Sequence, residues 1–267
     1  MAIPQADHLR LELDPGAVVT AYGRHRRRFA SSATSLDEAA LGTPSRCSEW
    51  TVADVLRHGC DVDRWLHTIW AGEAPFTAFD PRVTPHESVV EGRSVPDVEV
   101  RDRYVASAEA MAAEVDGSGP DRWEQPSLSF VGAVPWWVGL LHGLFDSWVH
   151  ERDLLLPLGR NVTVLSDEVD AVLAYSLAVV AYVGLRRGDE EPADAVVCGF
   201  RVTADEGRVT VTRSSGSPPS GVPVLTGDPP VVVDALSGRC ALEGVLTGSA
   251  TTVHRFGVLA RFFTTPV

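Results

Sequence analysis

The sequence contains no lysine, and its 23 basic residues, all arginine, stand against 36 acidic ones for a net charge of −13. The arginines are scattered apart from the run Arg26 to Arg28, which is typical of a solvated helix face. A nucleic acid would be repelled by this charge and would find no basic stripe to bind. Uncharged apolar runs are also short, since none reaches the ~18 residues needed to span a bilayer. We therefore expect neither nucleic acid nor a membrane as a partner.

Cysteines are few and widely separated, at positions 47, 60, 198 and 240, with no CxxC pair among them. This spacing argues against a zinc knuckle and against a disulfide framework. Cys60 is typical of a core residue, and Cys47 is also interpreted as structural although it lies just before a predicted helix. The N-terminal residues lack a basic segment followed by an apolar run, so no secretory signal is expected. A reduced, cytoplasmic protein is the resulting prediction.

The 267 residues are enough for two domains and a sizeable core, and the hydrophobic period changes along them. Apolar residues at helical spacing predict helices over 15–41, 51–69, 97–115, 134–156 and 166–187. After an acidic link at 188–195, alternation predicts strands over 196–203, 208–212, 222–226 and 242–247, with helices at 230–236 and 250–263. The predicted fold class is therefore α+β.

Two local signals refine this order of elements. Thr51 and Asp54 form the pattern of a capping box at the start of the second helix. The segment 71–94 contains three prolines and is longer than most connections in compact domains. We predict that this segment is a loop that forms a lid or a wall of a substrate site.

Three polar residues stand four positions apart in the predicted helix 134–156: His142, Asp146 and His150. A helix places them on one face, and the neighbouring helix can add His58. Two histidines and a carboxylate are a common ligand set for Zn²⁺ and similar ions. Burying these groups unpaired in an otherwise apolar helix would cost about 1 to 3 kcal/mol each. The spacing predicts a metal site at His58, Asp146 and His150, with satisfied core or surface histidines as the alternative.

Residues near these candidates have further possible roles. His142 is predicted to be an additional ligand or a polar wall of the site. Asp153, one turn after His150, is interpreted with Arg152 as a pair that supports the ligands or as a capping interaction.

The residues from Cys47 through Trp50 to His58 follow the pattern C-x-x-W-T-V-x-D-x-L-x-H, and Asp146, His150 and Asp153 supply a later acidic and histidine motif. Together they resemble the mycothiol-dependent maleylpyruvate isomerase family of DinB-like metalloproteins. The resemblance implies an up-down four-helix bundle that holds a divalent metal, usually zinc, over residues 1–190. It also implies a small sterol-carrier-like α/β domain over 191–267.

The resemblance also implies roles for single residues. His58, Asp146 and His150 are the implied metal ligands, although the family normally has glutamate where Asp146 stands. Arg239, in the element that begins at Leu236, matches an arginine expected to face a cleft between the domains and to bind a carboxylate. We expect Arg239 and His142 to be catalytic, and Arg239 to contribute to cofactor binding as well. The family's Gly-Asp pair in the tail is replaced here by Gly248 and Ser249.

The implied activity is that of a metal-dependent mycothiol S-transferase or isomerase, with mycothiol as a thiol cosubstrate. A metal-bound thiolate would add to an electrophilic small molecule, leading to maleylpyruvate-type isomerisation, conjugation or sulfur transfer in natural-product assembly. One alternative is a thiol-independent DinB-like metalloenzyme of secondary metabolism. Another is a metal-free binding or regulatory protein. A monomer or a homodimer is expected in every case.

Overall fold

The computed structural model describes residues 8–71, 84–129, 131–187, 194–205 and 207–260. The chain divides into two compact units. One unit consists of Pro15–Val164, and the other combines Met1–Asp14 with Leu165–Pro266. The predicted α+β fold class, a helical bundle followed by a smaller mixed unit, is confirmed.

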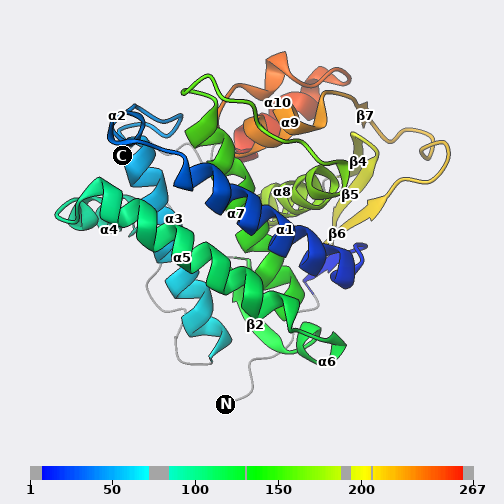
Figure 1. Cartoon of the computed structure of the whole chain (residues 1–267). Helices are drawn as coiled ribbons and strands as arrows, with labels where there is room; N and C mark the ends of the chain where they lie inside the picture. Colours follow the sequence, from blue (N-terminus) through cyan, green and yellow to red (C-terminus); the bar gives the residue numbers. More distant parts are fainter. Residues whose placement is uncertain (1–7, 72–83, 130, 188–193, 206, 261–267) are drawn as a thin grey trace. The chain divides into compact units, whose positions relative to one another are not determined.

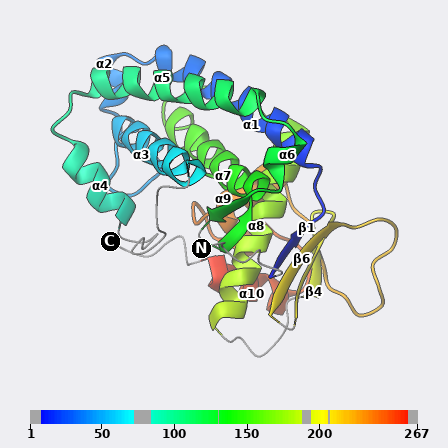
Figure 2. The same cartoon turned by 90° about the horizontal axis from the view of Figure 1, so that it is seen from below.

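Four long helices form the first unit, α1 (Pro15–Thr34), α3 (Val52–Trp70), α5 (Asp97–Asp116) and α7 (Trp136–Leu155). Each packs against two others, so that α1 and α3 lie diagonally opposite. Figure 2 shows α1 beside α5 and α3 beside α7. The four apolar faces meet in the middle of this arrangement, where Tyr22, Leu56, Tyr104 and Leu140 are buried.

The directions of the helices differ from the expected up-down order. Along α3 and α5, Arg57 pairs with Asp97 and Asp63 accepts a hydrogen bond from Ser107, so these two neighbours are parallel. A parallel pair needs a long crossover. Residues 71–96 provide it, and they include the helix α4 (Thr84–Gly92). The expected loop therefore contains a helix in its second half, whereas residues 72–83 lie outside the described residues.

The start of α3 agrees with the predicted capping box. The Thr51 side chain accepts a hydrogen bond from the Asp54 amide, and the Asp54 carboxylate accepts one from the Thr51 amide. Two of the amides left unpaired at the helix N-terminus are thus satisfied. This cap fixes the residue at which α3 begins, and hence the face on which His58 lies two turns later.

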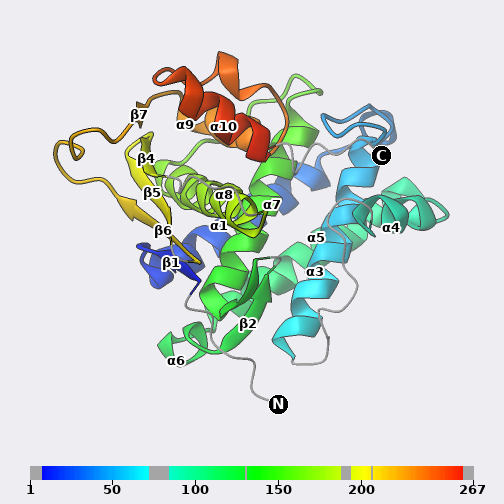
Figure 3. The same ribbon diagram turned by 180° about the vertical axis from the view of Figure 1, so that it is seen from behind.

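The second unit contains a five-stranded sheet in the order β1-β6-β5-β4-β7. Its strands are β1 (Leu9–Leu11), β4 (Asp194–Val197), β5 (Phe200–Asp205), β6 (Arg208–Arg213) and β7 (Val224–Leu225). The helices of this unit are α8 (Ser166–Arg187), α9 (Pro229–Leu236) and α10 (Ala250–Ala260). Figures 1 and 3 show α8 lying between the strands and the pair α9 and α10.

Helix α8 belongs to this second unit, so the two compact units divide at 164/165, whereas the resemblance implied a domain boundary at 190/191. The apolar face of α8 packs against β1, β5, β6, α9 and α10. By length and composition Ser166–Arg186 is long and apolar enough to cross a membrane, but most of it is buried, and the core helix of a soluble protein has the same properties. The N-terminal strand β1 completes the sheet by pairing in parallel with β6.

Several local predictions differ from the structure. The helix expected over 15–41, for which the sequence allowed a break near Ser31 and Ser32, ends at Thr34. A separate short helix, α2 (Glu38–Leu41), begins after the cap residue Asp37. The strand expected over 242–247 is a 3-10 turn at Leu242–Gly244. A hairpin of β2 (Pro126–Ser129) and β3 (Gly132–Pro135) precedes α7 and was not predicted. The short helix α6 (Pro120–Trp123) lies just before it.

Candidate metal centre

His58 of α3 and Asp146 and His150 of α7 converge on one point. Each offers one ligand atom, and these atoms all lie within 4.8 Å of one another. Asp146 Oδ1 is 3.4 Å from His58 Nε2 and 3.6 Å from His150 Nε2. The two imidazole rings meet edge to face with their centroids 4.8 Å apart. The structure therefore brings together the three residues whose spacing predicted a metal site.

The shorter carboxylate at position 146 still reaches this point. For a tetrahedral zinc ion with ligands at about 2.0 to 2.1 Å, adjacent nitrogen and oxygen ligands lie roughly 3.3 Å apart. The two distances from Asp146 Oδ1 are close to that value. Side-chain length alone thus does not exclude Asp146 from a ligand set.

The electrostatics of the group favour a positive charge between its members. Burial raises the pKa of Asp146, but the charges of His150 and His58 and the hydrogen bonds from both rings hold it well below its usual range. Burial lowers the pKa of His150, but Asp146 and the hydrogen bonds to Asp146, Asp153 and Cys47 hold it well above the usual value. An ionised carboxylate between two imidazole rings would also attract a metal cation.

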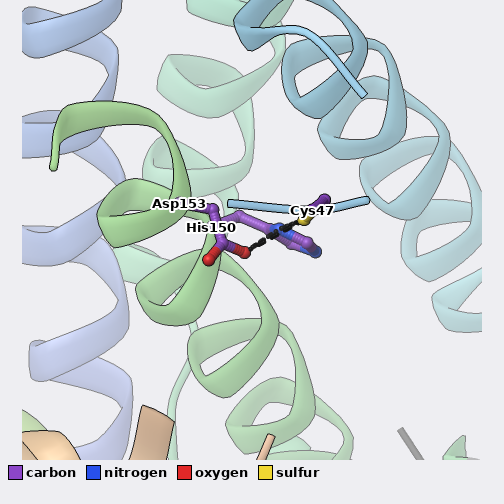
Figure 4. A group of neighbouring side chains, drawn as sticks. All are labelled: Cys47, His150 and Asp153. Atoms are coloured by element: carbon purple, nitrogen blue, oxygen red, sulfur yellow. Dashed lines mark hydrogen bonds and ion pairs between the residues drawn. The ribbon is translucent and has the colours of Figure 1, made fainter. Parts of the chain in front are cut away.

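The Nδ1 side of His150 faces a second group, which Figure 4 shows. Asp153 Oδ2 lies 3.0 Å from His150 Nδ1 and 3.2 Å from Cys47 Sγ. His150 and Asp153 come from α7, and Cys47 comes from the segment before α3. Arg152, which the sequence grouped with Asp153, lies over the ring of Trp148, 4.9 Å from its centroid. Asp153 therefore lies between His150 and Cys47.

Trp50 covers the two histidine rings and was not recognised as a site residue. Its ring centroid is 5.3 Å from that of His58 and 6.2 Å from that of His150, in a stacked orientation toward the latter. Its Nε1 donates to His86 Nδ1 of α4 at 3.3 Å. Helix α4 thus contacts the group through Trp50. The tryptophan and cysteine of the C-x-x-W pattern were the available signal.

His142 lies one turn before Asp146 but outside the group of three. Its ring meets that of Trp65 edge to face, with centroids 6.2 Å apart. Burial lowers the pKa of His142 to about 4, while Asp146 raises it and His58 lowers it. His142 is therefore a neutral polar group at pH 7.

Arg239 belongs to the other compact unit. Its Nη1 donates to the Ser237 carbonyl at 2.6 Å, and its backbone amide donates to the Asp234 carbonyl. It is partly buried just after α9.

A buried ionic network crosses the bundle next to the site. Arg26 is only 3% exposed, pairs with Asp63, and donates from Nη1 to Ser147 Oγ at 3.0 Å. Interpreting the arginine run as a solvated face was therefore wrong for Arg26, because its two terminal nitrogens pair with Asp63 and the hydroxyl of Ser147 in the core. Ser147 follows Asp146 directly, so this network fixes the turn of α7 that carries the candidate ligand.

The fold and the site define a helical bundle with a candidate metal centre between two antiparallel helices, joined to a small mixed α+β unit. Residues 22–155 match the family described as the mycothiol maleylpyruvate isomerase N-terminal domain. The chain therefore belongs to this family, which agrees with the resemblance seen in the sequence.

Solved structures agree with this fold. A crystal structure of the mycothiol-dependent maleylpyruvate isomerase matches with a TM-score of 0.61 and 19% sequence identity, over 89% of this chain and 94% of that chain. A histidine-to-alanine mutant of that isomerase matches with a TM-score of 0.59 at the same identity and coverage. The search of curated proteins found no match.

Proposed function

We propose that the protein is a metal-dependent, mycothiol-using isomerase or S-transferase that acts on an electrophilic small molecule. The observation that carries this proposal is the convergence of His58, Asp146 and His150 within 4.8 Å in a chain of the mycothiol maleylpyruvate isomerase family. The cytoplasm is the proposed site of action, because the widely separated cysteines predict a reduced protein.

The donor set fits a divalent ion of the zinc type. His58 Nε2, Asp146 Oδ1 and His150 Nε2 would hold it, which leaves a fourth position open. When bound, such an ion would favour the thiolate form of mycothiol at neutral pH, because the cation stabilises the negative charge.

Other residues of this chain would shield the metal centre from water and bind the substrate. Trp50, held by His86, would shield one side of the centre from water. His142, neutral at pH 7, would offer a hydrogen-bond donor or acceptor to the substrate beside Asp146. Arg239 is proposed to bind a substrate or thiol carboxylate, since its guanidinium can form two parallel hydrogen bonds to one carboxylate.

The reaction proposed first is isomerisation of a cis-enone acid of the maleylpyruvate type. The thiolate sulfur adds to the carbon–carbon double bond, the resulting single bond rotates, and elimination of the thiolate restores the double bond in the trans form. The thiol is regenerated, so substrate and product have the same composition. Addition without elimination would give a stable conjugate, and displacement of a leaving group would transfer the sulfur.

Incubation of the zinc-loaded protein with mycothiol and maleylpyruvate tests the proposal. Formation of the trans isomer, followed by absorbance, should require both protein and mycothiol. A parallel panel of electrophiles, read by mass spectrometry, would reveal conjugates or sulfur transfer. The variant His58→Ala/His150→Ala should reduce the rate at least 100-fold, a loss of about 2.7 kcal/mol of transition-state stabilisation. Wild-type rates no higher than the protein-free control with both classes of substrate would contradict thiol chemistry.

A further inference from the structure

His150 has two ring nitrogens, and the structure gives them different partners. Nε2 faces Asp146 Oδ1 at 3.6 Å, on the side shared with His58. Nδ1 faces Asp153 Oδ2 at 3.0 Å, on the opposite edge of the ring. Asp153 is fully buried, and its carboxylate is therefore available only to the neighbours that the fold provides.

The chemistry of a carboxylate decides which nitrogen carries a fixed proton. Arg46 Nε lies 3.7 Å from Asp153 Oδ1 and favours the carboxylate form. A carboxylate accepts hydrogen bonds and cannot donate them, so Nδ1 is then the donor to Asp153. Between Nε2 and Asp146, by contrast, either a proton or a metal cation can lie. The Asp153 contact thus leaves Nε2 as the nitrogen whose electron pair is available to a cation.

The segment before α3 holds Asp153 from the other side. The Cys47 thiol lies 3.2 Å from Asp153 Oδ2, and Arg46 Nε lies 3.7 Å from Oδ1. The Arg46 amide also donates to the Asp153 carbonyl at 3.1 Å. These contacts leave the carboxylate little freedom to rotate away from His150.

A second metal ion among Cys47, His150 and Asp153 is the competing interpretation, because their ligand atoms also lie within 4.8 Å of one another. The guanidinium of Arg46 argues against it. A divalent cation on Asp153 would lie beside this permanent positive charge, in a buried place where like charges repel strongly. Hydrogen bonds from Nδ1 and from the thiol satisfy the acceptor oxygens of Asp153 without this electrostatic repulsion.

We infer that Asp153, held by Cys47 and Arg46, is a positioning residue for His150 that directs Nε2 toward the point shared with His58 and Asp146. This inference rests on the proposed metal centre. A carboxylate on the far nitrogen also makes an imidazole a stronger electron-pair donor, which would compensate in part for the shorter side chain at Asp146.

The test compares full-length wild type with Asp153→Asn, an isosteric change that removes the charge. Zinc affinity, measured by competition with a chromophoric chelator, should fall about tenfold to a hundredfold. In the metal-free wild type, the His150 Nδ1 proton should give a slowly exchanging low-field NMR resonance, which should weaken in Asp153→Asn. Thermal unfolding of both metal-free proteins shows whether the fold persists.

Two further variants separate positioning from other roles. Glu151→Gln changes a carboxylate that is also buried on α7, is the neighbour of His150, and is paired with Arg28. It should leave zinc affinity within about threefold of wild type even if it lowers thermal stability. Cys47→Ala should also stay within about threefold, because a thiol that only donates to Asp153 is not a ligand.

The outcomes distinguish this inference from the proposed function. An Asp153→Asn protein that binds zinc as tightly as wild type, or a wild type without the protected Nδ1 proton, would overturn the positioning role. Two zinc ions per wild-type chain together with loss of one in Cys47→Ala would overturn it in favour of a second metal site. A wild type that binds no zinc but shows the protected proton would contradict the proposed function and leave the orientation of His150 by Asp153 standing.

Discussion

His25 and His150 are both buried in the bundle, but their partners favour opposite protonation states. Arg28 Nη2 donates to His25 Nδ1 at 2.7 Å, and His25 Nε2 donates to Ser147 Oγ at 2.9 Å. Burial, with the nearby charges of Arg28 and Arg26, holds the pKa of His25 well below its usual value. Glu151 Oε2 lies farther from His25 Nδ1, at 3.7 Å. His150 faces Asp146 and Asp153, and its pKa is held well above the usual value. The two buried histidines therefore differ in protonation because their neighbours differ.

His25 should make the fold sensitive to acid. Its pKa is lower in the folded state than the value of about 6.5 in the unfolded chain. Below about pH 6.5 the unfolded chain therefore binds a proton that the folded protein does not, and this contribution to stability falls as the pH falls. His25→Gln should flatten the dependence of the unfolding free energy on pH below that point, by up to about 1.4 kcal/mol per pH unit.

Urea denaturation at several pH values between 5 and 7 measures this slope. The hydrogen bond to Ser147 can be kept by the glutamine amide, so the variant is expected to fold. An identical slope in wild type and variant would show that His25 does not remain neutral in the folded protein.

At the residue scale, the fixed period of a helix placed Asp146 and His150 on one face, and the expected packing of the neighbouring helix added His58. Cys47 and Trp50 were visible in the sequence pattern, but their contacts with His150 depend on how a non-helical segment folds back onto α7. Neither helical nor strand periodicity in the sequence predicts the course of a non-helical segment. The burial of Arg26 was missed for the same reason, since its partner Asp63 lies on a different helix.

A capping side chain determines the residue at which helix α3 begins. Thr51 and Asp54 cap its first turn reciprocally, and Thr51→Ala would leave the Asp54 amide without its partner. The variant should lower the unfolding free energy by about 1 kcal/mol, within a range of roughly 0.5 to 2 kcal/mol. Chemical denaturation followed by circular dichroism measures the change.

Thr20→Ala is the matched control. Thr20 is an exposed threonine in the first half of α1, where its hydroxyl donates to the Gly16 carbonyl of the same helix. Its replacement should change the unfolding free energy by no more than about 0.5 kcal/mol. Equal effects of the two variants would mean that the cap does not stabilise α3.

At the element scale, the long amphipathic helices were predicted well and the short elements poorly. Strands β2 and β3 and helix α4 each span nine residues or fewer, which is too short for a period to emerge. The parallel course of α3 and α5 also escapes sequence analysis, because it depends on the crossover and not on either helix. The prediction of a strand over 242–247 was wrong because a short apolar run can also form a turn that packs into the core.

On the scale of the whole molecule, the chain's two units do not follow its sequence order. Strand β1, from the N-terminal segment, pairs with β6, from the C-terminal part, so the second unit is assembled from both ends of the chain. A boundary drawn from composition at 190 could not anticipate this pairing. Composition predicts the net charge that the protein surface carries. The family match spans only part of the chain, residues 22–155.

The metal content of the purified protein tests the central claim most directly. The experiment compares three proteins: wild type, His58→Ala/His150→Ala and the control His67→Ala. Each is stripped of metal and incubated with zinc, the excess zinc is removed, and the bound zinc is measured by mass spectrometry. His67 is the matched control because it lies on α3 with 66% of its side chain exposed and belongs to neither group of candidate ligands. Circular dichroism confirms that all three proteins are folded.

Wild type and His67→Ala are predicted to retain one zinc ion per chain. The double variant is predicted to retain less than about a tenth of that, since only Asp146 of the three candidate ligands remains. Equally little zinc in folded wild type and double variant would contradict a metal centre at His58, Asp146 and His150.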